Sequence, residues 1–217
     1  MKKLLITLLS TLSLTVYAET LINGAGATFP APVYSKWADA YNKETGAKLN
    51  YQAIGSGGGV KQIAAKTVDF GATDDPLSAE EVGKNNYYQF PAVVGGVVPV
   101  VNLKGIDTGK LVLSGQVLAD IFEGKITSWK DPAIAKLNPG IQFPDVALTR
   151  VVRADSSGTT AVFTDYLSQV SESFKKNIGT NKTVQWAAGN ITAGKGNAGV
   201  AAMVQQIQGT IGYVEYA

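Results

Sequence analysis

The 217-residue chain contains no cysteine and no histidine. Without cysteine it can form no disulfide, no thiolate metal site and no cysteine nucleophile. Without histidine it can form neither a Ser-His-Asp triad nor a histidine zinc site, and it lacks the commonest general base. These absences exclude the commonest catalytic and metal-binding side chains. We expect no catalytic residue, no metal site and no cofactor.

Long hydrophobic runs are scarce, and the one that stands out is at the N-terminus. Lys2 and Lys3 precede an apolar run from Leu4 to Val16, and Val16-Tyr17-Ala18 fits a small-residue cleavage site. The run is too short for a comfortable membrane span. We predict a signal peptide over residues 1–18, cleaved after Ala18. No cysteine follows it to carry a lipid anchor, so a soluble periplasmic protein is expected.

A charge excess is also missing once the leader is removed. The whole chain has 19 Lys+Arg against 17 Asp+Glu, and removal of Lys2 and Lys3 leaves 17 of each sign. Such a balance gives no reason to expect nucleic acid or an anionic membrane as a partner. Arginine occurs at Arg150 and Arg153 alone, so an anion site has to be local.

The remaining pattern alternates strands with helices, which is typical of an α/β fold with a largely parallel sheet. The expected strands are one ending at 21–22 and those over 48–54, 68–72, 90–101, 146–152 and 211–216. The expected helices lie over 28–46, 60–65, 114–123, 131–137, a segment from 161 and 198–206, with a short one capped by Ser78 and Glu81. We divide the mature chain into a first lobe over 19–95 and a second over 96–217.

Three junctions between a strand and a helix consist of small polar residues: Gly24–Phe29, Gly55–Gly59 and Arg153–Thr160. A loop of this kind leaves backbone N–H groups free at a helix N-terminus, where the helix dipole favours an anion. In open α/β sheets, ligands bind outside the carboxyl ends of the strands. We interpret the three junctions as parts of one shared anion site.

Each junction also has a simpler interpretation. Thr28 is placed to cap the first helix, Gly55–Gly59 suits a flexible turn, and Arg153 with Asp155 suits a surface ion pair beside a Ser/Thr cap. Gly24-Ala25-Gly26 resembles the start of a dinucleotide fingerprint, but Phe29 occupies the third glycine position. No glycine-rich loop ends in the Gly-Lys-Ser or Gly-Lys-Thr of a P-loop.

Asp74 follows a predicted strand and differs in character from the three junctions. An ionised carboxylate only accepts hydrogen bonds, so it suits an anion that keeps a proton to donate. Phosphate at neutral pH keeps one, whereas sulfate does not. A site built to receive that hydrogen can reject an analogue that lacks it by about 10⁴ to 10⁵. The simpler interpretation is a turn aspartate before Asp75-Pro76.

The motifs together resemble one family. They are Gly24-Ala-Gly-Ala-Thr-Phe-Pro-Ala-Pro-Val-Tyr34, Tyr51-Gln-Ala-Ile-Gly-Ser-Gly-Gly-Gly-Val-Lys-Gln62, Val68-Asp-Phe-Gly-Ala-Thr-Asp74, Arg153–Thr159 and Gly209-Thr-Ile-Gly-Tyr-Val-Glu215. In this combination the chain resembles the periplasmic phosphate-binding proteins of bacterial ABC phosphate-uptake systems. The resemblance implies a two-lobed type II, or Venus-flytrap, α/β fold that closes over its ligand. It also implies a monomer that delivers inorganic phosphate to a membrane ABC permease with its transmembrane subunits and ATPase.

The resemblance also implies site residues. It implies phosphate contacts from Thr28, Phe29, Ser56 and Asp74 in one lobe and from Arg153, Ser157, Gly158 and Thr159 in the other. Asp155 would orient Arg153.

The chain departs from the family at its end. Family members continue beyond the Gly-Tyr-Val-Glu-Tyr strand and return to complete the first lobe, whereas this chain stops at Ala217. We therefore expect an incomplete first lobe. Two other functions stay open: a binding protein for arsenate, sulfate or molybdate, and a secreted phosphatase that uses Ser157 or Ser56.

Overall fold

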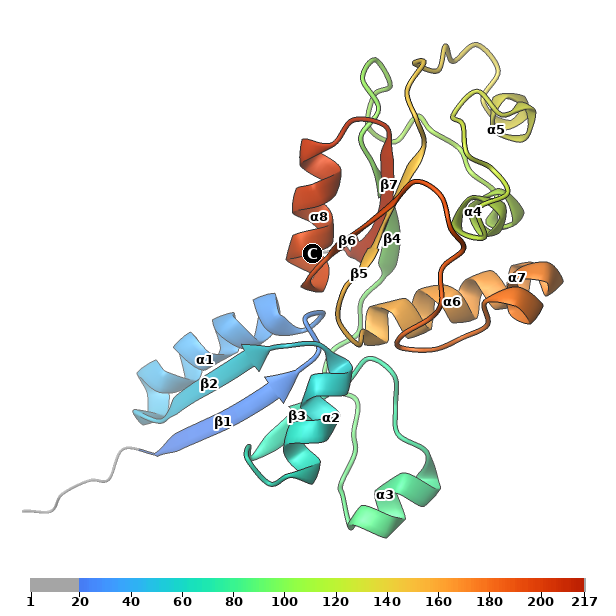
Figure 1. Cartoon of the computed structure of the whole chain (residues 1–217). Helices are drawn as coiled ribbons and strands as arrows, with labels where there is room; N and C mark the ends of the chain where they lie inside the picture. The colour runs from blue at the N-terminus through green and yellow to red at the C-terminus, as the bar shows by residue number, and fades with distance from the viewer. Residues whose placement is uncertain (1–19, 217) are drawn as a thin grey trace, which may run out of the picture.

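The computed structural model describes residues 20–216, so the predicted signal peptide over 1–18 lies outside the described residues. The chain forms two sheets, one of three strands in the order β2-β1-β3 and one of four strands in the order β4-β7-β5-β6. Each sheet carries its own helices, and Figure 1 shows the two resulting units one above the other. No helix in residues 20–216 has the length and hydrophobicity needed to cross a membrane.

The N-terminal unit is drawn in blue to green at the bottom of Figure 1. Its elements are β1 Leu21–Gly26, α1 Ala31–Thr45, β2 Lys48–Ala53, α2 Ser56–Ala64, β3 Phe70–Ala72 and α3 Ala79–Asn85. β1 pairs in parallel with both β2 and β3, so the carboxyl ends of all three strands lie at one edge. That edge faces the other unit (Figure 1).

The C-terminal unit holds the remaining elements. They are β4 Val97–Val101, α4 Gly115–Phe122, α5 Pro132–Leu137, β5 Thr149–Arg153, α6 Gly158–Val170, α7 Glu172–Asn177, β6 Ile191–Gly194, α8 Gly196–Gln206 and β7 Thr210–Glu215. β5 is parallel to β6 and β7, whereas β4 is antiparallel to β7. The expectation of a largely parallel α/β arrangement is confirmed.

The hydrophobic core lies in the C-terminal unit. Trp129, Phe122 and Tyr213 are completely buried there, and the rings of Phe163 and Tyr213 stack with centroids 4.3 Å apart. α4 buries Val117, Leu118 and Ile121, as its helical spacing predicts. Burial of large apolar side chains is the main favourable term in folding, so this unit supplies a stable base for its loops.

Several element predictions are confirmed by the structure. Ser78 and Glu81 form the complete capping box of α3, and Gly46 ends α1 in the left-handed conformation that suits glycine. Ser114 and Asp131 accept hydrogen bonds from the first turns of α4 and α5.

Other element predictions were wrong. The valine-rich segment 90–101 forms a strand only from Val97, because Pro91 and the Gly95-Gly96 pair interrupt it, and Phe90 is exposed. β1 extends through Gly24 to Gly26, so these glycines lie in a strand rather than in a loop. The short strand β6 is absent from the strands that we predict, because its polar composition gives little sign of a strand that forms by pairing with β5.

Thr28 does not cap α1, contrary to one interpretation of the sequence. The N-cap position is Pro30, which has no side-chain hydrogen bond to the helix. The Thr28 hydroxyl instead faces the C-terminal unit, where Arg153 and Asn197 donate hydrogen bonds to it. The position of Thr28 therefore shows that the Gly24–Phe29 junction contributes to a contact between the two units.

Candidate functional site

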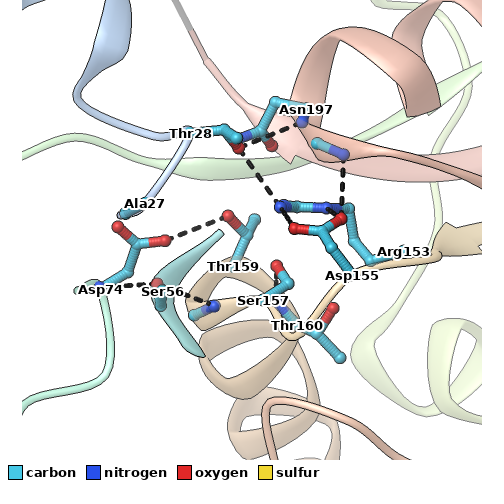
Figure 2. A network of polar contacts seen from close by, with 12 residues as sticks. Ala27, Thr28, Ser56, Asp74, Arg153, Asp155, Ser157, Thr159, Thr160 and Asn197 are labelled. Carbon is cyan, nitrogen blue, oxygen red and sulfur yellow. Dashed lines mark hydrogen bonds and ion pairs between the residues drawn. The ribbon is translucent and has the colours of Figure 1, made fainter. Parts of the chain in front are cut away.

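The three polar junctions meet where the two units face each other (Figure 2). Arg153 Nη2 donates to Thr28 Oγ1 at 3.3 Å, across 125 positions of sequence. The backbone N–H of Gly158 donates to Ser56 Oγ at 3.1 Å. Thr159 Oγ1 donates to Asp74 Oδ2 at 3.3 Å. Parallel strands place these residues at one edge, so segments that are distant in sequence form a single polar cluster.

Arg153 and Asp155 form a buried bidentate pair rather than a surface pair. Arg153 Nε lies 2.9 Å from Asp155 Oδ1 and Nη2 lies 2.6 Å from Oδ2, while the arginine side chain is 2% exposed. Burial raises the pKa of Asp155, but the hydrogen bonds from Arg153 and from the Gly196 N–H outweigh it and hold that pKa below its usual range. Asp155 therefore stays ionised and fixes the guanidinium plane.

One donor of Arg153 remains unsatisfied. Its Nη1 is buried and has no hydrogen-bond partner among the described residues. A buried donor without an acceptor is costly, and a charged one is costlier still. An anion that accepts this hydrogen bond would remove the cost, so Nη1 indicates a ligand position beside Arg153.

The N-terminus of α6 lies at the centre of the cluster. Ser157 caps this helix, with its Oγ accepting from the Thr160 N–H at 3.0 Å. Gly158 lies so close to the N-terminal unit that a Cβ there would be 2.4 Å from Ser56 Oγ and 2.7 Å from Asp74 Cβ. Glycine is thus required for the close approach of the two units at the start of α6.

Asp74 is a carboxylate set among hydrogen-bond donors. Burial raises its pKa to about 6, against smaller lowering effects from the Thr159 hydroxyl and the Arg153 charge. Its own backbone N–H donates to Ser56 Oγ at 3.2 Å. The side chain therefore accepts hydrogen bonds at neutral pH and becomes a donor in mild acid.

Phe29 lies immediately before α1, where backbone N–H groups are not used by the helix itself. Its ring packs against Gly95, because a Cβ at that glycine would lie 2.8 Å from Phe29 Cζ. The ring thereby contacts the segment through which the chain passes from one unit to the other.

The sequence did not point to Gly196 and Asn197, at the start of α8. The Gly196 N–H donates to Asp155 Oδ1 at 2.9 Å, and Asn197 Nδ2 donates to Thr28 Oγ1 at 2.8 Å. The segment 190–197 is rich in glycine, threonine and asparagine before a helix, so it shared the signal of the three junctions.

Two further polar contacts surround the cluster. Tyr213 Oη accepts from the Arg153 N–H at 3.4 Å and lies 2.8 Å from Thr160 Oγ1, and burial raises the pKa of Tyr213 to about 12. Lys182 of the C-terminal unit forms an ion pair with Asp75 of the N-terminal unit.

Arg150 belongs to a different environment. Its guanidinium donates to the carbonyls of Phe122, Ala187 and Ala188 at 2.9–3.0 Å, so it joins loops of the C-terminal unit.

A cavity of about 610 Å³ lies beside the cluster. Its lining includes Thr28, Asp155 and Asn197 of the cluster together with apolar residues such as Ile54 and Val214. Ser56, Asp74 and Gly158 do not line it, so this part of the cluster lies next to the cavity rather than inside it. Within residues 20–216 no group of three or more acidic side chains gathers as a metal site would require.

The chain is similar over nearly its whole length to known proteins. A family model described as "PBP superfamily domain" matches residues 14–217. The phosphate-binding protein PstS of Pasteurella multocida is 58% identical over 214 residues, covering 99% of this chain and 61% of that protein. PstS of Methanocaldococcus jannaschii is 41% identical over 206 residues, covering 90% of this chain and 53% of that protein. The chain thus spans between half and two thirds of the length of these two relatives.

Solved structures share the fold. A putative phosphate ABC transporter substrate-binding protein from Clostridium perfringens, with bound phosphate, superposes with a TM-score of 0.71 at 22% identity, over 91% of this chain and 71% of that one. A high affinity periplasmic phosphate-binding protein (PfluDING), also bound with phosphate, gives a TM-score of 0.66 at 26% identity, over 89% of this chain and 55% of that one.

Proposed function

The chain belongs to the PBP superfamily and has its type II α/β fold, and from that premise we propose that it captures inorganic phosphate in the periplasm for import by an ABC permease. Relatives named phosphate-binding protein PstS, and phosphate-bound structures of similar fold, support phosphate as the ligand. Residues 1–18 act as the export signal, with cleavage after Ala18. The protein works as a monomer, without a cofactor and without catalysis.

The observation that carries this proposal is the buried donor Arg153 Nη1, which has no partner in the described residues. Asp155 engages Nε and Nη2 but leaves Nη1 aside, so this donor stays open to a ligand. A tetrahedral oxyanion offers an acceptor for Nη1 and a countercharge together.

The remaining predicted residues complete the oxyanion site. Hydroxyl and backbone donors come from Thr28, Phe29, Ser56, Ser157, Gly158 and Thr159. Asp74 accepts the hydrogen that phosphate retains, and Asp155 holds Arg153 in place. Hydrogen bonds between these residues, such as the one from Thr159 to Asp74, support their closeness.

The selectivity of the site follows from Asp74. Its ionised carboxylate repels an oxyanion without a proton, such as sulfate or molybdate. It accepts a hydrogen bond from an oxyanion that carries one. Arsenate resembles phosphate in charge and protonation, so the site would accept it as an alternative ligand.

The two units act as the lobes of the binding protein. We assign residues 19–95 to the first lobe and 96–217 to the second, with the ligand between them. Close packing of Gly55 and Gly57 against Asp155 and Ser156 supports a closed arrangement, since a Cβ at either glycine would overlap the other unit. The closed form would be the one that the permease recognises.

The two arginines provide a matched test. Arg153→Met removes the countercharge of the ligand and should weaken phosphate binding by about 3–5 kcal/mol, the usual cost of leaving a buried charge uncompensated. Arg150→Met should lower thermal stability but leave the phosphate dissociation constant of the folded protein unchanged. Isothermal titration with phosphate measures the dissociation constants of both variants. An unchanged dissociation constant for Arg153→Met would show that the Arg153 loop is a helix cap and not a ligand site.

A further inference from the structure

Asn197 lies at the first turn of α8 and reaches across to the other unit (Figure 2). It is 6% exposed, and it contacts Thr28, from which it is separated by 169 positions of sequence. No ligand contact has been assigned to it above. Its contacts nevertheless decide how a neighbouring ligand-binding hydroxyl is oriented.

The acceptor capacity of Thr28 Oγ1 is filled by protein donors. Asn197 Nδ2 lies at 2.8 Å, the Asn197 N–H at 3.2 Å and Arg153 Nη2 at 3.3 Å. A hydroxyl has two acceptor lone pairs and one hydrogen to donate. Three donors share these two lone pairs, so the Thr28 hydrogen has to point away from all three.

Ser56 offers a parallel case at the other side of the cluster. Its Oγ accepts from the Asp74 N–H at 3.2 Å and from the Gly158 N–H at 3.1 Å, so its hydrogen is also directed outward. Both donors to Ser56 are backbone N–H groups, so no side-chain substitution can turn either of them into an acceptor. The shortest contact to Thr28 comes from the Asn197 side chain, so a mutation at Asn197 can change whether the Thr28 hydroxyl donates to a ligand or to the protein.

The orientation of the Asn197 amide is itself determined. Asn197 Oδ1 accepts from the Glu215 N–H at 3.0 Å, and a backbone N–H can only donate. The oxygen end of the amide therefore faces β7, and the NH₂ end faces Thr28. An amide flip would place two donors together at Glu215 and is excluded by this contact.

We propose that Asn197 is a positioning residue that fixes Thr28 as a hydrogen-bond donor to the bound oxyanion. The Asn197 amide occupies Thr28 Oγ1 as an acceptor, so the hydroxyl hydrogen stays available to a ligand oxygen. Because the amide is anchored to β7 in one unit and holds Thr28 in the other, the donor becomes oriented as the units meet. This inference rests on the proposed phosphate-binding function.

The test is a double-mutant cycle read by phosphate titration. Asn197→Asp keeps the shape and the acceptor for the Glu215 N–H, but it replaces the NH₂ donor with an oxygen to which the Thr28 hydroxyl turns. Thr28→Val keeps the shape of Thr28 and removes its hydroxyl. Asn190→Asp, at an exposed position of the same unit, adds the same charge away from the cluster.

We expect Asn197→Asp to weaken phosphate binding about tenfold more in the chain with Thr28 than in the Thr28→Val chain, the size of one hydrogen bond to a charged ligand. Charge repulsion alone acts in both backgrounds and cancels from this ratio. Asn190→Asp should leave the affinity unchanged.

Equal effects of Asn197→Asp in the two backgrounds would overturn the positioning role while leaving the proposed function intact. Absence of phosphate binding by the unsubstituted chain would overturn the proposed function and this inference with it. If Asn197→Asp does not fold, Asn197→Ala replaces it in the same cycle. It removes the shortest of the three contacts to Thr28 Oγ1 and leaves those from the residue 197 N–H and Arg153 Nη2, so we expect a smaller ratio of about threefold. A ratio near one for that variant would equally contradict the inference.

Discussion

The two units differ in what holds them together. The C-terminal unit packs Trp129, Phe122 and Tyr213 into a continuous core. In the N-terminal unit, α1 buries none of its residues, and the buried apolar side chains among residues 20–96 are three alanines, Ala25, Ala27 and Ala47. The larger aromatic rings of this unit pack mainly on one another, as Tyr34 does on Tyr51 at 4.9 Å, and remain partly exposed.

In the proposed phosphate site, this difference gives the two units different parts. The well-packed unit carries the charged groups Arg153 and Asp155, which need a rigid setting because a buried ion pair depends on good geometry. The loosely packed unit carries the hydroxyls of Thr28 and Ser56 and the carboxylate of Asp74. A ligand that bridges both units would therefore stabilise the N-terminal unit more than its partner.

The largest expected effect tests this contrast with one substitution at two places. Trp129→Ala removes a fully buried ring whose Nε1 donates to the Gly209 carbonyl at 2.8 Å, and should lower the free energy of unfolding by about 3–5 kcal/mol. Trp37→Ala, in α1, removes a ring that is 52% exposed, and should cost about 1 kcal/mol or less. Urea denaturation followed by circular dichroism compares them. Similar losses would contradict the proposed difference in packing.

Asp74 should weaken the fold as the pH rises. Burial raises its pKa from the ordinary 3.8 to about 6, so the native state binds a proton more tightly than the unfolded chain does. Stability from this group is complete below about pH 4 and is lost as the pH rises through about 6. Asp74→Asn should thus be more stable than the parent at pH 8 by about 2 kcal/mol, with little difference at pH 4.

Thermal or urea unfolding without phosphate at the two pH values measures this effect. If the free energies of unfolding of Asp74→Asn and the parent differed more at pH 4 than at pH 8, the result would contradict this prediction.

The contact between the units is tested by a pair of glycines in helices. A Cβ at Gly57 would lie 2.2 Å from Ser156 Oγ and 2.6 Å from its Cβ, whereas nothing lies within 4 Å of one at Gly83. Gly57→Ala should weaken phosphate binding by about 1–3 kcal/mol, because the units cannot approach fully. Gly83→Ala should leave binding unchanged and stabilise α3 by about 0.5 kcal/mol. Calorimetry would contradict the close approach if both variants bound phosphate equally.

The smallest effect concerns the ion pair of Lys182 and Asp75, which joins the units at the rim of the cluster. Partly exposed pairs contribute about 0.2–1 kcal/mol, so Lys182→Met should speed phosphate dissociation by up to about fivefold at low salt. Lys130→Met breaks an exposed pair with Asp145 inside the C-terminal unit and should not change the rate. Stopped-flow measurements at rising ionic strength should bring the Lys182 variant and the parent together. A persistent gap in high salt would point to a different cause.

The sequence predicted the parts of the site that depend on local chemistry. Polar junctions at strand ends, the α3 capping box and the helix faces of α4 are set by residues close together in the chain, and the structure contains them. Parallel pairing then explains why the junctions meet, since it brings strand ends to one edge.

The parts that were missed depend on contacts between distant segments. Asn197 reaches Thr28, and Lys182 reaches Asp75, across 169 and 107 positions. Thr28 was assigned a local capping role that its distant partners replace. The segment 90–96 shows the converse, because its valines and phenylalanine suggest a buried strand but find no partner strand in residues 20–216.

The ratio of phosphate to sulfate affinity, measured by calorimetry at pH 8 for the parent and for Asp74→Asn, tests the central claim most directly. The account predicts that the parent prefers phosphate by about 10⁴ or more, because ionised Asp74 accepts the ligand hydrogen and repels sulfate. Asp74→Asn should lose most of this preference while it still binds phosphate. The same ratio in both proteins would contradict a site in which Asp74 accepts a hydrogen bond from the proton of the ligand.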